Sequence, residues 1–161
     1  MILHPAVEPV AIEVATATLE DVQGIHDLLE HYARAGELLP RPLNNICRQI
    51  QQFYVIRNAG CVVACASLEV FTRSLGEVRS LAVDARYQAH GLGRQLVAHI
   101  IKTAQNLGMK RLMALTYVPE FFGRLEFEIV SKDIFPEKVW GHCIHCPKHK
   151  ACDEIAVLRY L

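Results

Sequence analysis

The chain has 161 residues, of which 52% are hydrophobic, and this length and composition suit a single domain with a sizeable core. Lysine plus arginine and aspartate plus glutamate both number 17, and this balance argues against a module that binds nucleic acid or an anionic membrane surface. No apolar run approaches the roughly 20 residues of a membrane span, and residues 1–17 lack the regions of a signal peptide. We therefore expect a cytoplasmic protein whose six cysteines are thiols or metal ligands rather than disulfides.

The spacing of hydrophobic residues, together with glycines and prolines that end or interrupt helices and strands, predicts the elements in chain order. They are an N-terminal arm at 1–9, a strand at 10–17, a helix at 18–36, an irregular loop at 38–42, a short helix at 43–52, a hairpin at 53–71, a strand at 76–83, a helix at 92–107, a strand at 111–117, a short helix at 119–125, and strands at 127–130 and 154–161. This order predicts one α/β domain over 10–161, with a mixed sheet rather than strict βαβ alternation.

Two glycines mark the point where the strand at 76–83 leads into the helix at 92–107. The first turn of a helix has N–H groups without an intrahelical partner, and glycine lets a ligand approach them closely. Gly91 and Gly93 therefore favour an anion site of the kind that holds phosphate, and Arg86, His90 and Arg94 add donors. The alternative is a tight turn with no ligand. The stretch matches neither a nucleotide P-loop nor a complete dinucleotide fingerprint.

The stretch Gln88-Ala89-His90-Gly91-Leu92-Gly93, after "VRSLAVD", resembles the acyl-CoA-binding signature of the GNAT N-acetyltransferase superfamily. The resemblance implies a single GNAT-like domain with a mixed, mostly antiparallel central sheet, splayed fourth and fifth strands, and helices on both faces. It also implies acetyl-CoA as co-substrate. The pantetheine contacts then fall on Leu81, Ala82 and Val83, and the pyrophosphate contacts fall on Gln88, Ala89, His90, Gly91, Leu92, Gly93 and Arg94.

Further blocks, among them "AGELLPR", "TYVPEFF" and "KVWGHCIHCPK", resemble the short, kinase-free N-acetylglutamate synthases. That family implies direct transfer of an acetyl group to the α-amine of L-glutamate, the first step of arginine biosynthesis. A pocket for two carboxylates needs fixed cations, preferably arginine. The resemblance places Arg41 of "LLPR" in this pocket, and Arg79 and Lys138 are the next candidates. The alternative for each is a solvated surface charge.

Acetyl transfer to an amine needs a base, because free amines are largely protonated at neutral pH. Glu77, at the start of the strand beside the acetyl group, is the candidate base, and its alternative is a solvated carboxylate at a strand end. By register, Phe122 stands where many superfamily members have a tyrosine that protonates the leaving thiolate. Tyr117 is the candidate substitute, or the thiolate leaves unassisted. Glu126 stands where the pattern usually has glycine, so we expect a distorted turn or a carboxylate there.

A loop at 142–152 is rich in cysteine and histidine. Cys143, Cys146 and Cys152 begin with a C-x-x-C spacing that suits zinc. A redox or inert thiol cluster and a plain structural loop remain open as alternatives, and the loop follows the segment expected to cover the amino-acid pocket, where it would act as a lid. Cys65 is expected in the core or in the same pocket.

Other functions stay open from the sequence alone. The acceptor could be another amino acid, a polyamine or a protein N-terminus, and a pocket with two cations near the thioester would favour glutamate. A different class of function, a non-catalytic sensor of acyl-CoA or metal, is a further hypothesis. The strand edges at 153–161 are compatible with a homodimer.

Overall fold

The computed structural model describes residues 12–135 and 153–161. In this part of the chain one sheet contains seven strands in the order β1-β2-β3-β4-β5-β7-β6. The strands are β1 (Val14–Thr16), β2 (Phe53–Asn58), β3 (Cys61–Val70), β4 (Leu75–Val83), β5 (Arg111–Thr116), β6 (Glu128–Val130) and β7 (Ile155–Tyr160). Only β4 and β5 run parallel among these pairs. The expectation of a mixed, mostly antiparallel sheet in a single α/β domain is confirmed.

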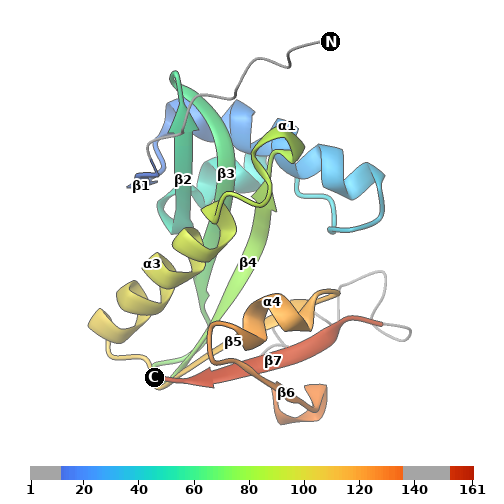
Figure 1. Ribbon diagram of the computed structural model, residues 1–161. Coiled ribbons are helices and arrows are strands. Elements are labelled where there is room, and N and C mark those ends of the chain that lie inside the picture. Colours follow the sequence, from blue (N-terminus) through green and yellow to red (C-terminus); the bar gives the residue numbers. More distant parts are fainter. Residues whose placement is uncertain (1–11, 136–152) are drawn as a thin grey trace.

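Helices cover both faces of the sheet (Figure 1). They are α1 (Val22–Arg34), α2 (Leu43–Arg48), α3 (Leu92–Asn106) and α4 (Pro119–Gly123), with single 3-10 turns η1 (Leu19–Asp21), η2 (Ile50–Gln52), η3 (Ala85–Tyr87) and η4 (Lys132–Ile134). Neighbouring residues of β2 point to opposite sides, since Val55 packs with α1 and α2 whereas Ile56 packs with α3. This alternation is the pattern of a strand buried on both faces.

The fourth and fifth strands separate soon after they meet. Their register runs from Leu75 opposite Arg111 to Glu77 opposite Met113, and beyond Glu77 the two strands diverge (Figure 1). The predicted splay is therefore confirmed. We call the paired stretch of the two strands, Leu75–Glu77 with Arg111–Met113, the seam. Within it, position 76 has no room for a side chain, because a Cβ on Gly76 would lie 2.7 Å from the Sδ of Met109.

A β-bulge deforms β4 just past the seam. Cys65 pairs with Ala82 and Ser67 pairs with Arg79, so one residue of β3 faces two residues of β4. Ser80, one of the two, has a φ of 53°. A bulge bends its strand and increases the local twist, and it thereby turns the end of β4 away from β5.

The predicted elements are found, with small differences at their ends. The predicted helix at 18–36 begins as the separate turn η1, where the carboxylate of Asp21 accepts a hydrogen bond from the Thr18 amide at 2.7 Å. The turn at Glu126 keeps the left-handed conformation that glycine would favour, with a φ of 67°. The Glu126 side chain is exposed and lies 3.2 Å from Arg159.

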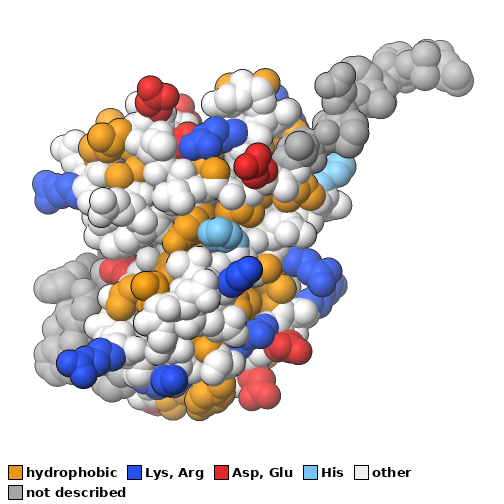
Figure 2. Space-filling view, turned by 90° about the vertical axis from the view of Figure 1, so that its left-hand side faces the viewer, with side chains coloured by type: hydrophobic (Ala, Val, Ile, Leu, Met, Phe, Trp, Pro, Cys, Tyr) orange, Lys and Arg blue, Asp and Glu red, His pale blue; other side chains and the backbone are white. Residues whose placement is uncertain are grey.

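Charged side chains of both signs are interspersed on the face of the molecule that Figure 2 shows. This distribution agrees with the zero formal net charge. No helix within residues 12–135 and 153–161 combines the length and apolar character needed to cross a bilayer.

Candidate active site

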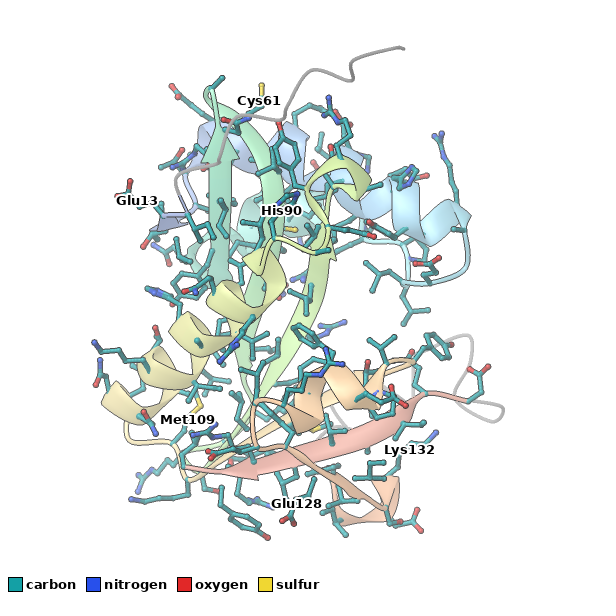
Figure 3. All side chains as sticks on the ribbon, viewed as in Figure 1. Glu13, Cys61, His90, Met109, Glu128 and Lys132 are labelled. Carbon is teal, nitrogen blue, oxygen red and sulfur yellow. The ribbon has the colours of Figure 1, made fainter. Side chains whose placement is uncertain are left out.

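A cleft of about 1460 Å³ lies between the separated ends of β4 and β5. Most of the residues predicted for the coenzyme and the acceptor line it. They are Arg41, Glu77, Arg79, Leu81, Ala82, Val83, Gln88, Ala89, Gly91, Leu92, Gly93, Arg94 and Tyr117. His90 is exposed in the loop before α3 and does not line the cleft (Figure 3). Lys138 lies outside the described residues.

The glycine loop forms one end of this cleft. Ala89 and Gly91 both have positive φ values, 65° and 80°, and α3 begins directly after Gly91. The first amides of this 15-residue helix border the cleft, where the helix dipole favours an anion. A Cβ at Gly93 would lie 3.4 Å from the Phe121 ring, so the absence of a side chain keeps the space between α3 and this ring open.

Tyr32 connects α1 to the end of β4 and to the glycine loop, and no pattern in the sequence indicated this contact. Its hydroxyl donates a hydrogen bond to the carbonyl of Val83 and accepts one from Nε2 of Gln88 at 2.7 Å. Burial raises the pKa of Tyr32, so the hydroxyl keeps its proton at neutral pH. The helical spacing of α1 marked Tyr32 as a packing residue, and only the fold brings its hydroxyl to β4.

Arg41 lines the cleft and is buried, only 8% exposed. Neutral groups from four segments hold its guanidinium. Nε donates to Asn45 Oδ1 at 2.7 Å, Nη1 donates to the hydroxyls of Ser67 at 3.3 Å and Ser80 at 2.8 Å, and Nη2 donates to Gln49 Oε1. The group also lies 4.7 Å from the centre of the Phe53 ring. We call Asn45, Gln49, Ser67 and Ser80 the Arg41 cage.

The cage supplies hydrogen-bond acceptors but no negative charge. Burial, followed by repulsion from Arg79, lowers the pKa of Arg41 to about 10, so the guanidinium stays protonated at neutral pH. A guanidinium has five N–H groups, and the cage uses four of them. Within the described residues one N–H on Nη2 therefore stays open, and no carboxylate bonds the guanidinium directly, although the nearby Glu69 and Glu77 offset part of its charge.

Arg79 differs from Arg41 because acidic side chains accompany it. Its Nη1 donates to Oε2 of Glu69 at 2.6 Å, and its Nε lies 3.7 Å from Oε1 of Glu77. Glu77 is only 3% exposed and stands where β4 still pairs with β5. The predicted base is thus not the solvated strand-end carboxylate of the alternative.

The aromatic residues after β5 take different positions. Phe122 is buried and packs edge-on against Phe121 and Phe127, so it serves the core. Tyr117 is 41% exposed at the cleft, and its hydroxyl donates to Asp153 Oδ1 at 2.7 Å.

Among the cysteines that the structure describes, Cys65 lies in the core, whereas Cys47 and Cys61 are exposed. Cys65 is fully buried with Sγ 3.5 Å from the Ser80 carbonyl, and burial raises its pKa to about 12. Cys143, Cys146 and Cys152, the predicted zinc ligands, lie outside the described residues. No group of three or more cysteine, histidine or acidic side chains suited to a metal occurs within 12–135 and 153–161.

Comparison with known proteins identifies the class to which this fold and cleft belong. The model of the acetyltransferase (GNAT) family matches residues 22–127. The chain is 36% identical over 148 residues to an uncharacterized N-acetyltransferase of Chlorobaculum tepidum, covering 92% of this chain and 96% of that protein. The chain belongs to the GNAT acetyltransferase family.

Two amino-acid enzymes are among the relatives. An amino-acid acetyltransferase of Mycobacterium tuberculosis is 33% identical over 132 residues, covering 77% of this chain and 75% of that enzyme. The N-acetylglutamate synthase of Neisseria gonorrhoeae, solved with coenzyme A and N-acetyl-glutamate, superposes with a TM-score of 0.82 at 28% identity. That match covers 92% of this chain but 35% of the longer Neisseria chain.

Proposed function

We propose that this chain transfers the acetyl group of acetyl-CoA directly to the α-amine of L-glutamate. The single observation that carries the proposal is Arg41, a buried protonated guanidinium at the cleft whose hydrogen-bond acceptors are all neutral. Burying a charge without a counter-ion costs several kcal/mol, and a substrate carboxylate would offset that cost. The amino-acid acetyltransferases among the relatives support an acceptor of this class.

The coenzyme end of the cleft suits acetyl-CoA. The amides at the start of α3 and the side chain of Arg94 would hold the pyrophosphate, and the end of β4 would pair with the pantetheine as an added strand does. The solved relatives from Mycobacterium tuberculosis and Neisseria gonorrhoeae contain coenzyme A. The coenzyme and the acceptor would then meet at the bulge of β4, where the acetyl group would lie beside the acceptor amine.

The chemistry needs two proton movements. Glu77 would take a proton from the ammonium group of the acceptor, directly or through water, so that the nitrogen lone pair attacks the thioester carbon. Tyr117, after its hydroxyl turns away from Asp153, would give a proton to the leaving thiolate as the carbon–sulfur bond breaks. A thiol of pKa about 8.5 is already a fair leaving group, so its departure without a proton donor is the alternative. The product, N-acetylglutamate, would serve arginine biosynthesis in the cytoplasm.

The test is release of free CoA by the purified chain with each of the twenty amino acids. Glutamate should give the highest kcat/KM, and the proposal fails if it gives no more turnover than glycine. Arg41→Lys should raise the glutamate KM by about tenfold, because lysine keeps the charge but cannot make the four cage hydrogen bonds and still present the open Nη2 N–H. Arg48→Lys, an exposed substitution on α2, is the matched control and should leave the KM unchanged.

A further inference from the structure

The neutrality of the Arg41 cage is a second feature of the acceptor site, beyond the arginine itself. Gln49 and Asn45 both contact the guanidinium through amide oxygens, and each differs by one atom from a carboxylate that would also fit there. A glutamate or aspartate at either position would form a buried ion pair with Arg41. This chain instead carries an amide at both positions.

Other arginines near β4 and α1 do have acidic partners. Arg79 has Glu69 at 2.6 Å, and Arg57 has Asp21, with Nε 2.8 Å from Oδ1. These two partly buried arginines are thus paired with carboxylates, whereas the more deeply buried Arg41 receives four neutral acceptors from α2 and its C-terminal end, β3 and β4. The cage fixes the direction of the guanidinium without neutralising its charge.

From this contrast we infer that Gln49 and Asn45 are specificity-determining residues, which leave Arg41 without a hydrogen-bonded carboxylate so that this partner must come from the acceptor. This inference rests on the proposed function. It adds to that function the feature that makes the site select an acidic acceptor. Neither residue is assigned a part in the chemistry. Both act through Arg41, as positioning residues.

The decisive variant is Gln49→Glu, which changes one amide into a carboxylate and supplies Arg41 with a counter-ion from within the protein. It should raise the glutamate KM at least tenfold and leave the acetyl-CoA KM within twofold. It should also raise the melting temperature measured without substrates, because the buried cation gains a partner. A merely structural role for Gln49 predicts the opposite pairing, a lower melting temperature with both KM values unchanged.

The matched control is Gln51→Glu, the same substitution two residues along on an exposed side chain. Equal glutamate KM values in the two variants would overturn the inference. Asn45→Asp provides a second test at Nε of the guanidinium and should show the same pair of effects. If the wild-type chain prefers a different acidic amino acid and Gln49→Glu raises its KM, the choice of glutamate is wrong while this inference stands. If glutamate is acetylated and neither acidic variant changes its KM, the inference fails while the proposed function stands.

Discussion

Tyr32 and Val83 lie 51 positions apart in the sequence and meet through a hydrogen bond from the tyrosine hydroxyl to the valine carbonyl. Gln88, the first residue of the glycine loop, donates to the same hydroxyl at 2.7 Å. One phenol therefore fixes the end of β4 and the start of the glycine loop relative to α1. The loop's position depends on a helix that the acyl-CoA signature does not include.

Removing this hydroxyl should weaken coenzyme binding more than acceptor binding. Tyr32→Phe keeps the ring and breaks two hydrogen bonds, each contributing about 1 kcal/mol. We expect the acetyl-CoA KM to rise about three- to tenfold, with the glutamate KM within twofold, in steady-state assays. Tyr160→Phe, at a 73% exposed position, is the control. An unchanged acetyl-CoA KM in Tyr32→Phe would show that the loop holds its shape without the phenol.

The two glycines that flank α3 allow backbone strain to be separated from ligand contact. Gly91 and Gly108 have φ values of 80° and 85°, and a Cβ at either would meet nothing within 4 Å. Alanine at each should lower the free energy of unfolding by about 1 kcal/mol, since the left-handed region disfavours side chains. Only Gly91→Ala should also raise the acetyl-CoA KM. Equal acetyl-CoA KM values in the two variants would remove the glycine loop from the coenzyme site.

Glu77→Gln tests the assignment of the base. Loss of the proton acceptor should lower kcat about 100-fold with little change in the acetyl-CoA KM. Glu37→Gln, at an exposed position on the rim of the same cleft, should leave kcat unchanged. A kcat for Glu77→Gln within threefold of wild type would exclude this carboxylate as the base.

Cys65 should take no covalent part in the transfer. Burial raises its pKa to about 12, so the thiolate that would attack a thioester is not formed at neutral pH. Cys65→Ala should therefore keep kcat within about threefold, in agreement with direct transfer. Recovery of an acetylated Cys65 peptide from protein quenched during turnover would contradict this prediction.

The pair of Asp21 and Arg57 gives a pH-dependent contribution to stability. The hydrogen bonds from Arg57 lower the pKa of Asp21 below its ordinary value of 3.8, in spite of burial. The contribution is therefore complete above about pH 4 and is lost as the pH falls through the folded-state pKa. Asp21→Asn should lower the free energy of unfolding at pH 7 by about 1–3 kcal/mol, and urea titrations should show the difference shrinking towards pH 2. A difference that stays constant down to pH 2 would mean that the carboxylate charge contributes nothing.

Local patterns in the sequence were sufficient for the elements and for the glycine loop. Gly91 and Gly93 lie between a clear strand and a clear helix, so their backbone role follows from neighbours in the chain. The separation of β4 and β5 was expected only through the family resemblance, because no single strand carries a signal for it. The prolines around Arg41 indicated an irregular loop but not where the side chain lies.

The surroundings of the site residues could not be predicted, because they come from distant segments. Ser67 and Ser80 belong to different strands and meet Arg41 only through the register of β3 and β4. The difference between Arg41 with neutral neighbours and Arg79 with acidic ones is invisible in the sequence. The resemblance ranked Arg41 ahead of Arg79 for the acceptor pocket, but the physical difference between their surroundings is seen only in the structure.

The short parallel seam at Leu75–Glu77 has a mechanical consequence. Three residue pairs are all that join β4 to β5 in the described sheet, so the strands on either side of this pairing form two parts connected by a short joint. A molecule bound along the free edge of β4, in the gap that faces β5, would restrict the relative motion of these two parts. Amide hydrogen exchange should then slow in β4 and β5 together when coenzyme A is added, even at residues that never touch it.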